Sequence, residues 1–201
     1  KNMNNTFLET VKKRRSNYDL SAVCPISDTQ LQQIVETAID NAPSAFNSQS
    51  SRVVVLKGKE HKVFWDIVRS ALKEVTPVEH FPKTEEKIKS FAAAYGTILY
   101  FEDQDTIQGL QEQFPLYARN FPIWSEHHTG LLQFIVWAAL ADAGIGANLQ
   151  HYNPLIDDEV KSRWDLPPNW KLVAQMPFGA CGSAPEDREH MDIAERLRIF
   201  G

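Results

Sequence analysis

Cysteine is scarce in this sequence of 201 residues, which contains only Cys24 and Cys181. Two cysteines are too few for a disulfide framework, and neither has a partner at C-x-x-C spacing. The scarcity excludes a small scaffold held together by disulfides and is typical of a protein from a reducing cytoplasm. We therefore predict a cytoplasmic location and assign no catalytic role to either thiol.

Long hydrophobic runs are absent as well. The longest candidate, residues 131–143, is interrupted by Gln133 and Asp142. It falls short of the roughly 18 to 20 apolar residues that cross a bilayer. The first residues do not have the charged, apolar and small-residue order of a signal peptide. Residues 1–2 precede Met3, and we interpret them as a cloning remnant outside the fold. These features predict no membrane partner.

Positive charge is in deficit, with 21 Lys and Arg against 26 Asp and Glu and a formal net charge of −5. The longest basic run is residues 12–15, whereas nucleic-acid binding needs a sustained basic face. We therefore predict no nucleic-acid partner, although a local phosphate site stays open. The length and the composition, 43% hydrophobic and 23% charged, fit one globular domain over residues 1–201.

The hydrophobic spacing predicts an α+β layer fold with few strands and long helices. The helices are expected at 4–15, 27–42, 61–75, 84–95, 125–143 and 157–164, and the strands at 52–57, 97–101 and 171–178. Ser27 begins a capping-box pattern. The tail mixes a helical pattern with a possible short strand at its end. The helix at 125–143 is apolar nearly all round, which favours a core or a dimer interface.

Two segments that could carry chemistry are rich in arginine. Arg14 and Arg15 precede Ser16 at the end of the first expected helix. Two guanidinium groups and a hydroxyl can grip a phosphate through charge-assisted hydrogen bonds. Taken alone, a basic helix end is more often solvated and simply favours the helix dipole. Arg188 follows the third expected strand in a loop containing Gly and Pro, where it could add a phosphate contact or be a surface charge.

Two further segments are rich in small and polar residues. Residues 43–49, Pro-Ser-Ala-Phe-Asn-Ser-Gln, offer the mixed donors and acceptors that a flat heterocycle needs. The same residue types dominate ordinary turns. Residues 144–151, Gly-Ile-Gly-Ala-Asn-Leu-Gln-His, contain glycines that let backbone approach a ligand closely. They lack the G-x-G-x-x-G spacing of a Rossmann fold, and alone a helix end followed by a loop is the simpler explanation.

In this order, the four segments resemble those of the FMN-dependent nitroreductase family, from Phe7 to about Arg188. The most specific match is the sequence of 43–49 followed by the Arg-Val-Val-Val of 52–55. The R-R-S tripeptide and the late P-x-x-R support it. The Gln-His pair and the short length are closest to the small fungal-type and bacterial branch. The resemblance implies a three-layer fold with a central, mostly antiparallel sheet flanked by helices, in an intertwined homodimer.

The same resemblance implies two FMN sites per dimer, each at the subunit interface. The residues that match the family's phosphate-binding positions are Arg14, Arg15, Ser16 and Arg188. Those that match its flavin-contacting loop, much of which reaches the partner's flavin, are Pro43, Ser44, Ala45, Asn47 and Gln49. Gln150 and His151 would lie near the reactive face of the isoalloxazine ring. No general acid or base and no metal ligand is assigned.

The activity implied is a ping-pong reaction. NADH or NADPH reduces FMN by hydride transfer, and a nitroaromatic, quinone or similar small molecule then takes the electrons. The flavin carries the chemistry and the protein places it. A same-fold flavin enzyme with other chemistry, such as reductive dehalogenation or flavin fragmentation, stays an alternative. So does a protein that holds FMN with little turnover, as a flavin store or redox sensor.

The resemblance assigns no role to some residues that could carry chemistry. A metal hydrolase could use His127 and His128 with His151 or His190, although adjacent helical histidines point about 100° apart and rarely chelate one ion. Residues 104–124 have no recognisable pattern. Their aromatic residues either line the substrate side or pack in the core, and they are Phe114, Tyr117, Phe121 and Trp124.

Overall fold

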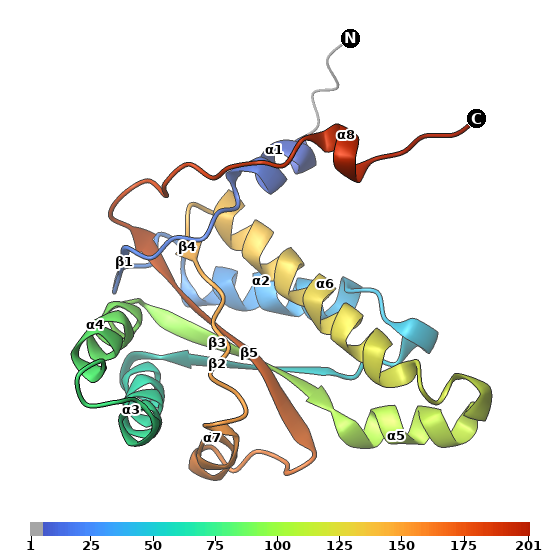
Figure 1. The fold of residues 1–201 in the computed structure, drawn as a ribbon, viewed down its shortest axis with the longest axis horizontal. Coiled ribbons are helices and arrows are strands. Elements are labelled where there is room, and N and C mark those ends of the chain that lie inside the picture. Colours follow the sequence, from blue (N-terminus) through green and yellow to red (C-terminus); the bar gives the residue numbers. More distant parts are fainter. Residues whose placement is uncertain (1–5) are drawn as a thin grey trace.

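The computed structural model describes residues 6–201 (Figure 1). The expectations for residues 1–2 and for a helix start at Asn4 lie outside the described residues. The sheet is antiparallel throughout its named strand pairs. Its strands in spatial order are β1 (Leu20–Ser21), β5 (Trp170–Cys181), β3 (Gly96–Asp103) and β2 (Ser51–Lys57), and β4 (Gly146–Ala147) also pairs with β5.

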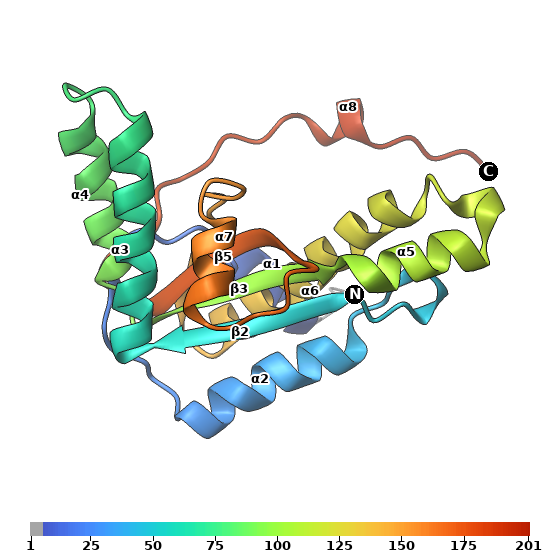
Figure 2. The ribbon, with the colours of Figure 1, turned by 90° about the horizontal axis from the view of Figure 1, so that it is seen from below.

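Helices cover both faces of this sheet, which confirms the expected three-layer α+β arrangement (Figures 1 and 2). On one face lie α2 (Asp28–Asn41) and α6 (Phe121–Asp142), with α1 (Thr6–Lys13) packed against α6. On the other lie α3 (Gly58–Val75), α4 (Phe81–Ala92) and α7 (Asp157–Arg163). Helix α5 (Gln104–Gln113) contacts α6 beyond the end of β3.

The alternation of side chains along β3 builds a core on each face. Every residue of this strand is buried. Ile98 and Tyr100 belong to the core under α2 and α6, whereas Leu99 and Phe101 belong to the core under α3, α4 and α7. Successive residues of a strand point to opposite faces, so the uninterrupted apolar run at residues 98–101 suits a sheet covered on both sides.

The structure corrects several sequence expectations. Helix α1 ends at Lys13 instead of Arg15, and α6 begins at Phe121, with proline in its first turn. The polar stretch after β3 contains α5, because the Asp103 side chain caps it by accepting from the backbone of the first turn. The tail contains the short α8 (Ile193–Arg196), and the structure assigns no strand to the residues after it.

A buried histidine joins α3 to β3. His61 is 1% exposed; its Nε2 lies 3.1 Å from the Ala92 carbonyl and its Nδ1 lies 2.9 Å from Thr97 Oγ1. Because a carbonyl only accepts, Nε2 carries the proton and Nδ1 accepts from the threonine hydroxyl. Trp65 Nε1 also donates to Thr97 Oγ1, at 2.9 Å. Burial lowers the pKa of His61, against a smaller opposing effect of the Ala92 hydrogen bond.

This lowered pKa makes stability depend on pH. As the pH falls through about 6.5, the ordinary histidine value, the unfolded chain takes up a proton at this position before the folded chain does, so stability is lost. We expect the free energy of unfolding to fall more between about pH 8 and 5.5 in the wild type than in His61→Gln, by up to about 1.4 kcal/mol per pH unit below 6.5. Urea unfolding of both proteins at the two pH values measures this difference. Equal pH dependence in the wild type and His61→Gln would contradict the prediction.

Candidate functional site

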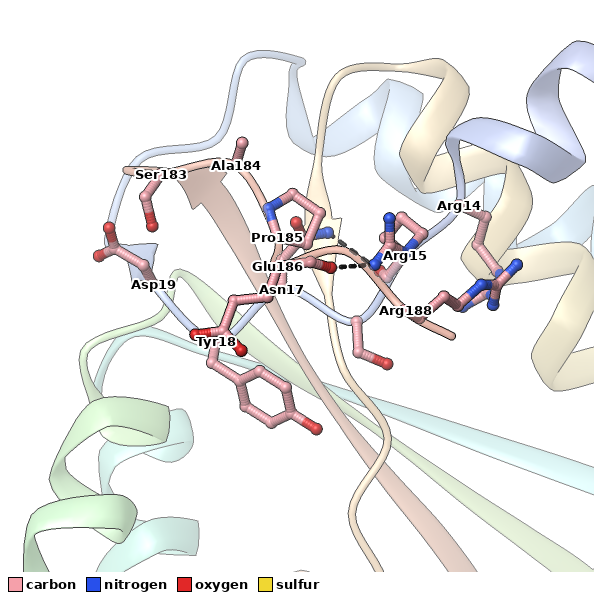
Figure 3. A pocket seen from close by; sticks show the side chains of 11 residues that line it. Arg14, Arg15, Asn17, Tyr18, Asp19, Ser183, Ala184, Pro185, Glu186 and Arg188 are labelled. Atoms are coloured by element: carbon pink, nitrogen blue, oxygen red, sulfur yellow. Dashed lines mark hydrogen bonds between the residues drawn. The ribbon is translucent and has the colours of Figure 1, made fainter. Parts of the chain in front are cut away.

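The segment after α1 and the loop after β5 enclose one pocket (Figure 3). Its volume is about 500 Å³, and it is lined by residues 14–19, residues 183–186 and Arg188. The side chains of Arg14 and Arg188 lie at one end and Asp19 and Ser183 at the other, and Arg15 lies between them beside Glu186 (Figure 3). The structure therefore brings together the two arginine-containing segments, which are far apart in the sequence.

Backbone hydrogen bonds hold the walls of this pocket. Asn17 N donates to the Ala147 carbonyl at 2.9 Å, and Ser16 forms a parallel bridge with Ala147. On the other wall, Gly182 N donates to the Asp19 carbonyl at 2.9 Å. The Arg15 guanidinium donates across the pocket to the Glu186 carbonyl. The two walls are thus tied to each other as well as to the sheet.

Three like charges converge at the arginine end. Burial, and then the charges of Arg188 and Arg15, lower the pKa of Arg14. The Arg14 guanidinium lies over the Trp137 ring, 4.4 Å from its centroid. Within residues 6–201, none of the three arginines forms a salt bridge with a carboxylate. An anion with two negative charges would relieve this repulsion and could accept several charge-assisted hydrogen bonds.

The loop at 43–49 does not line the arginine pocket. His128 Nδ1 of α6 is 2.9 Å from the Pro43 carbonyl, and Trp137, whose ring lies beneath Arg14, is nine positions further along the helix. At 1.5 Å per helical residue this spacing is about 14 Å along α6. The loop lines its own cavity of about 410 Å³, formed by Pro43, Ser44, Ala45, Phe46, Trp124, His127, His128 and Leu131.

Phe46 connects this loop to the aromatic residues of 104–124, for which the sequence did not decide between the substrate side and the core. Its ring lies within 4.8 to 6.0 Å, between ring centroids, of four other rings. These belong to Phe114, Tyr117, Phe121 and Trp124. Phe121 is buried, whereas Tyr117 and Phe46 are 46% and 49% exposed. The cluster therefore runs from the core to the mouth of the loop's cavity.

The third segment is linked to the arginine pocket by a row of side-chain amides. Gln150 Nε2 donates to Asn148 Oδ1 at 2.8 Å, and Asn148 Nδ2 donates to the Asn17 carbonyl at 2.8 Å. Asn148 is fully buried. Gln150 is half-buried and His151 is exposed, and neither lines the two cavities described above.

Of the two glycines in this segment, Gly144 has no atom within 4 Å of where a Cβ would lie, whereas Gly146 leaves no room for a ligand. A Cβ on Gly146 would collide with Cys181 Sγ and lie 3.0 Å from Leu20. The close approach expected there is therefore made by the protein's own strands β1 and β5.

Metal ligation and membrane insertion are not suggested by the described residues. Among residues 6–201, no group of three or more His, Cys, Asp or Glu side chains is arranged to hold a metal ion. In the same range, no helix combines the length and apolar character that crossing a bilayer requires. Cys24 and Cys181 are both free.

Comparison with known proteins agrees with this architecture. The sequence profile of the nitroreductase family matches residues 11–180. The chain belongs to the nitroreductase family. Nitroreductase FRM2 of Saccharomyces cerevisiae is 34% identical over 184 residues, which are 90% of this chain and 91% of the relative. Membership supports an oxidoreductase role.

Solved structures share the fold. Nitroreductase CinD from Lactococcus lactis is 40% identical with a TM-score of 0.89, over 98% of this chain and 100% of that one. CinD has been solved in complex with chloramphenicol, nicotinic acid and 4-nitrophenol. A structure from Desulfovibrio desulfuricans in complex with FMN is 17% identical with a TM-score of 0.71, over 99% of each chain. The expected nitroreductase-like fold is therefore confirmed.

Some residues around the site were missed by sequence reasoning. Tyr18 and Asp19 line the arginine pocket, and Trp137 supports Arg14 from a helix that looked merely hydrophobic. Asn148 lies inside a segment that was singled out for its glycines. The chemical type of each residue was visible, but its partner lies far away in the sequence.

Asn148 offers a test of the amide row. Replacing it with alanine removes the acceptor for Gln150 and the donor to the Asn17 carbonyl in a fully buried place. We expect Asn148→Ala to lower the free energy of unfolding by about 1–3 kcal/mol. Asn41→Ala, at the exposed end of α2, serves as the control and should cost about 0.5 kcal/mol or less. Equal stability of both variants in urea unfolding would show that the row contributes nothing.

Proposed function

We propose that this protein is an FMN-dependent oxidoreductase that works as a homodimer. In this proposal NADH or NADPH supplies the reducing equivalents, and a small nitroaromatic, quinone or similar acceptor takes them in a second, separate step. The observation that carries the proposal is the convergence of Arg14, Arg15 and Arg188 on one pocket, where none of the three is paired with a carboxylate among the described residues.

The residues present fit the phosphate of FMN. A phosphate monoester carries close to two negative charges and accepts bidentate hydrogen bonds from guanidinium groups. Three guanidinium groups and the Ser16 hydroxyl meet this requirement, and the backbone of Asn17 and Gly182 keeps the walls in place. The pocket volume of about 500 Å³ is also of the size that cofactor sites have.

The resemblance of the 43–49 loop to a family segment that reaches the partner's flavin supports a dimer. The arginine pocket and this loop lie about 14 Å apart along α6. Apolar side chains left exposed offer a surface for the second chain. They include Leu131 of α6 at 44% and, in the tail, Ile193, Leu197, Ile199 and Phe200 at 53% to 90%. The tail runs away from the sheet of its own chain (Figure 2).

In this proposal the chain's own residues bind FMN and orient it. When bound, FMN supplies the hydride and electron chemistry. Arg14, Arg15 and Arg188 hold the phosphate, and the loop residues Ser44 and Asn47 present hydroxyl and amide groups to the ring of the partner's flavin. The aromatic cluster around Phe46 forms an apolar wall that suits a flat acceptor. The binding of 4-nitrophenol by CinD supports nitroaromatic compounds as the first acceptors to test.

The cofactor assignment is tested by FMN titration and by reduction. The wild-type protein should bind about one FMN per chain, and NADH or NADPH should bleach the bound flavin. Arg188→Ala should weaken FMN binding at least about tenfold, because a charge-assisted hydrogen bond contributes about 1.5–3 kcal/mol. Arg163→Ala removes an arginine paired with Glu60 instead and should bind FMN as the wild type does.

Each outcome has a separate meaning. A wild-type chain that does not bind FMN would contradict the proposed function. Binding without reduction by either nucleotide would instead indicate a flavin-binding protein with little turnover. Unchanged affinity in Arg188→Ala would contradict the phosphate assignment only.

Mixed dimers test whether each site is shared between two chains. If it is, a dimer of one Arg188→Ala chain and one Asn47→Ala chain has one intact site and one doubly altered site. Random mixing makes about half of the dimers mixed, so about a quarter of all sites should regain wild-type FMN affinity. Refolding the two variants together and titrating FMN measures this fraction. No recovery, with dimer exchange shown by differently tagged chains, would contradict a site shared between two chains.

A further inference from the structure

A carboxylate is buried without a cation at the end of β3. Glu102 is 0% exposed. Its Oε2 accepts from Ser50 Oγ at 2.5 Å and from Ser125 Oγ at 2.8 Å, and its Oε1 accepts from Ser51 Oγ. Among the described residues 6–201, Glu102 forms no salt bridge. A buried charge is costly unless hydrogen bonds satisfy it, and here three hydroxyl groups do so.

Two of these hydroxyl groups, those of Ser50 and Ser51, lie at the boundary of the 43–49 loop. Ser50 follows the loop directly, and its carbonyl accepts from Asp103 N at 2.9 Å. Ser48 Oγ lies 3.5 Å from Ser50 Oγ. Because Ser50 gives its proton to Glu102, Ser48 is the donor of this weak contact. Glu102 therefore holds the C-terminal end of the loop.

The same face of α6 holds both ends of the loop. Ser125 and His128 are three residues apart, so they project from one side of the helix. Both are buried, at 5% and 4% exposure. His128 contacts the Pro43 carbonyl at the start of the loop, and Ser125 reaches the loop's end through Glu102. The loop is thus fastened at two points to one rigid element.

The backbone of the loop explains why it needs this fastening. Phe46, Asn47 and Gln49 have φ values of 56°, 50° and 48°, a left-handed region that non-glycine residues rarely adopt. Such conformations persist only where the surroundings over-determine them. Inside the loop the restraining hydrogen bonds are few: Asn47 N and Ser48 N donate to the carbonyls of Ser44 and Ala45, and Gln49 N donates to Ser44 Oγ.

We propose that Glu102 is a positioning residue for the flavin site, which acts through Ser50, Ser51 and Ser125 to hold the 43–49 loop in its left-handed conformation. This role rests on the proposed function, since the loop is the part that meets the partner's flavin. Glu102 itself does not touch the cofactor. It fixes the place of the loop's hydroxyl and amide groups before FMN binds, so that no binding free energy is spent on ordering them.

The first test uses the protein without FMN and asks whether the loop loosens. Glu102→Gln keeps the size of the side chain but replaces one accepting oxygen by an NH₂ group, which cannot accept from a serine. We expect hydrogen exchange at the amides of Asn47, Ser48 and Gln49 to become at least about tenfold faster. Thr97→Val is the matched control, because it breaks an equally buried network under α3 and should leave these three amides unchanged.

A second pair of variants keeps the test decisive if Glu102→Gln does not fold. Ser125→Ala removes one donor to Glu102 from the helix side and should loosen the same three amides, whereas Ser125→Thr keeps the hydroxyl and should restore their protection. Loop exchange equal to the wild type in Glu102→Gln and Ser125→Ala would overturn the proposal. Equal acceleration in Thr97→Val would overturn it too, because the effect would then be general destabilisation.

FMN titration of the same variants separates this role from the proposed function. Glu102→Gln should bind FMN at least about fivefold more weakly, and Thr97→Val should bind it as the wild type does. A loop that loosens while FMN affinity stays at the wild-type value would overturn the link to the flavin site. If the wild type itself does not bind FMN, the proposed function fails, and the exchange rates still decide whether Glu102 holds the loop.

Discussion

Leu132, Val136 and Leu140 of α6 pack in one core with Ile98 and Met176 of the sheet, and this packing positions α6 relative to the arginine pocket, the 43–49 loop and Glu102. Since α6 is one continuous helix of 22 residues, residues at fixed intervals along it arrive at fixed places on the sheet. Ser125 meets Glu102, His128 meets Pro43, and Trp137 lies beneath Arg14. Shifting α6 along the sheet would therefore disturb the phosphate pocket and the loop together.

Charged groups that lack a salt-bridge partner lie near both ends of α6, but they are stabilised differently. At one end, three arginines face a solvent-open pocket with no carboxylate paired to them among the described residues. At the other end, the Glu102 carboxylate is buried and accepts hydrogen bonds from serine hydroxyl groups. Its charge is therefore stabilised without a ligand. Only the first arrangement leaves its charges available for an incoming anion. This difference is why the arginine end supports the cofactor proposal and the Glu102 end supports a positioning role.

Sequence reasoning succeeded where the signal is local. The apolar spacing predicted α2, α3 and α6 and the strands β2, β3 and β5 close to their observed ranges, and the capping box at Ser27 is present in full. It failed for β1 and β4, because two-residue strands have no period to detect. It also missed α5, whose polar residues hide a helix that begins at the capping side chain of Asp103.

What the sequence by itself determined is the family, the layer architecture and the segments that carry chemistry, because each depends on residues that are neighbours in the chain. The tertiary structure alone decided which segments meet. Arg188 joins Arg14 only because β5 returns to the segment after α1, and residues 43–49 stay apart from both because α6 spans the distance between them. Glu102 could not be singled out beforehand, since its serine partners come from two other elements. Contacts of this kind follow from strand pairing and helix packing, which no local pattern specifies.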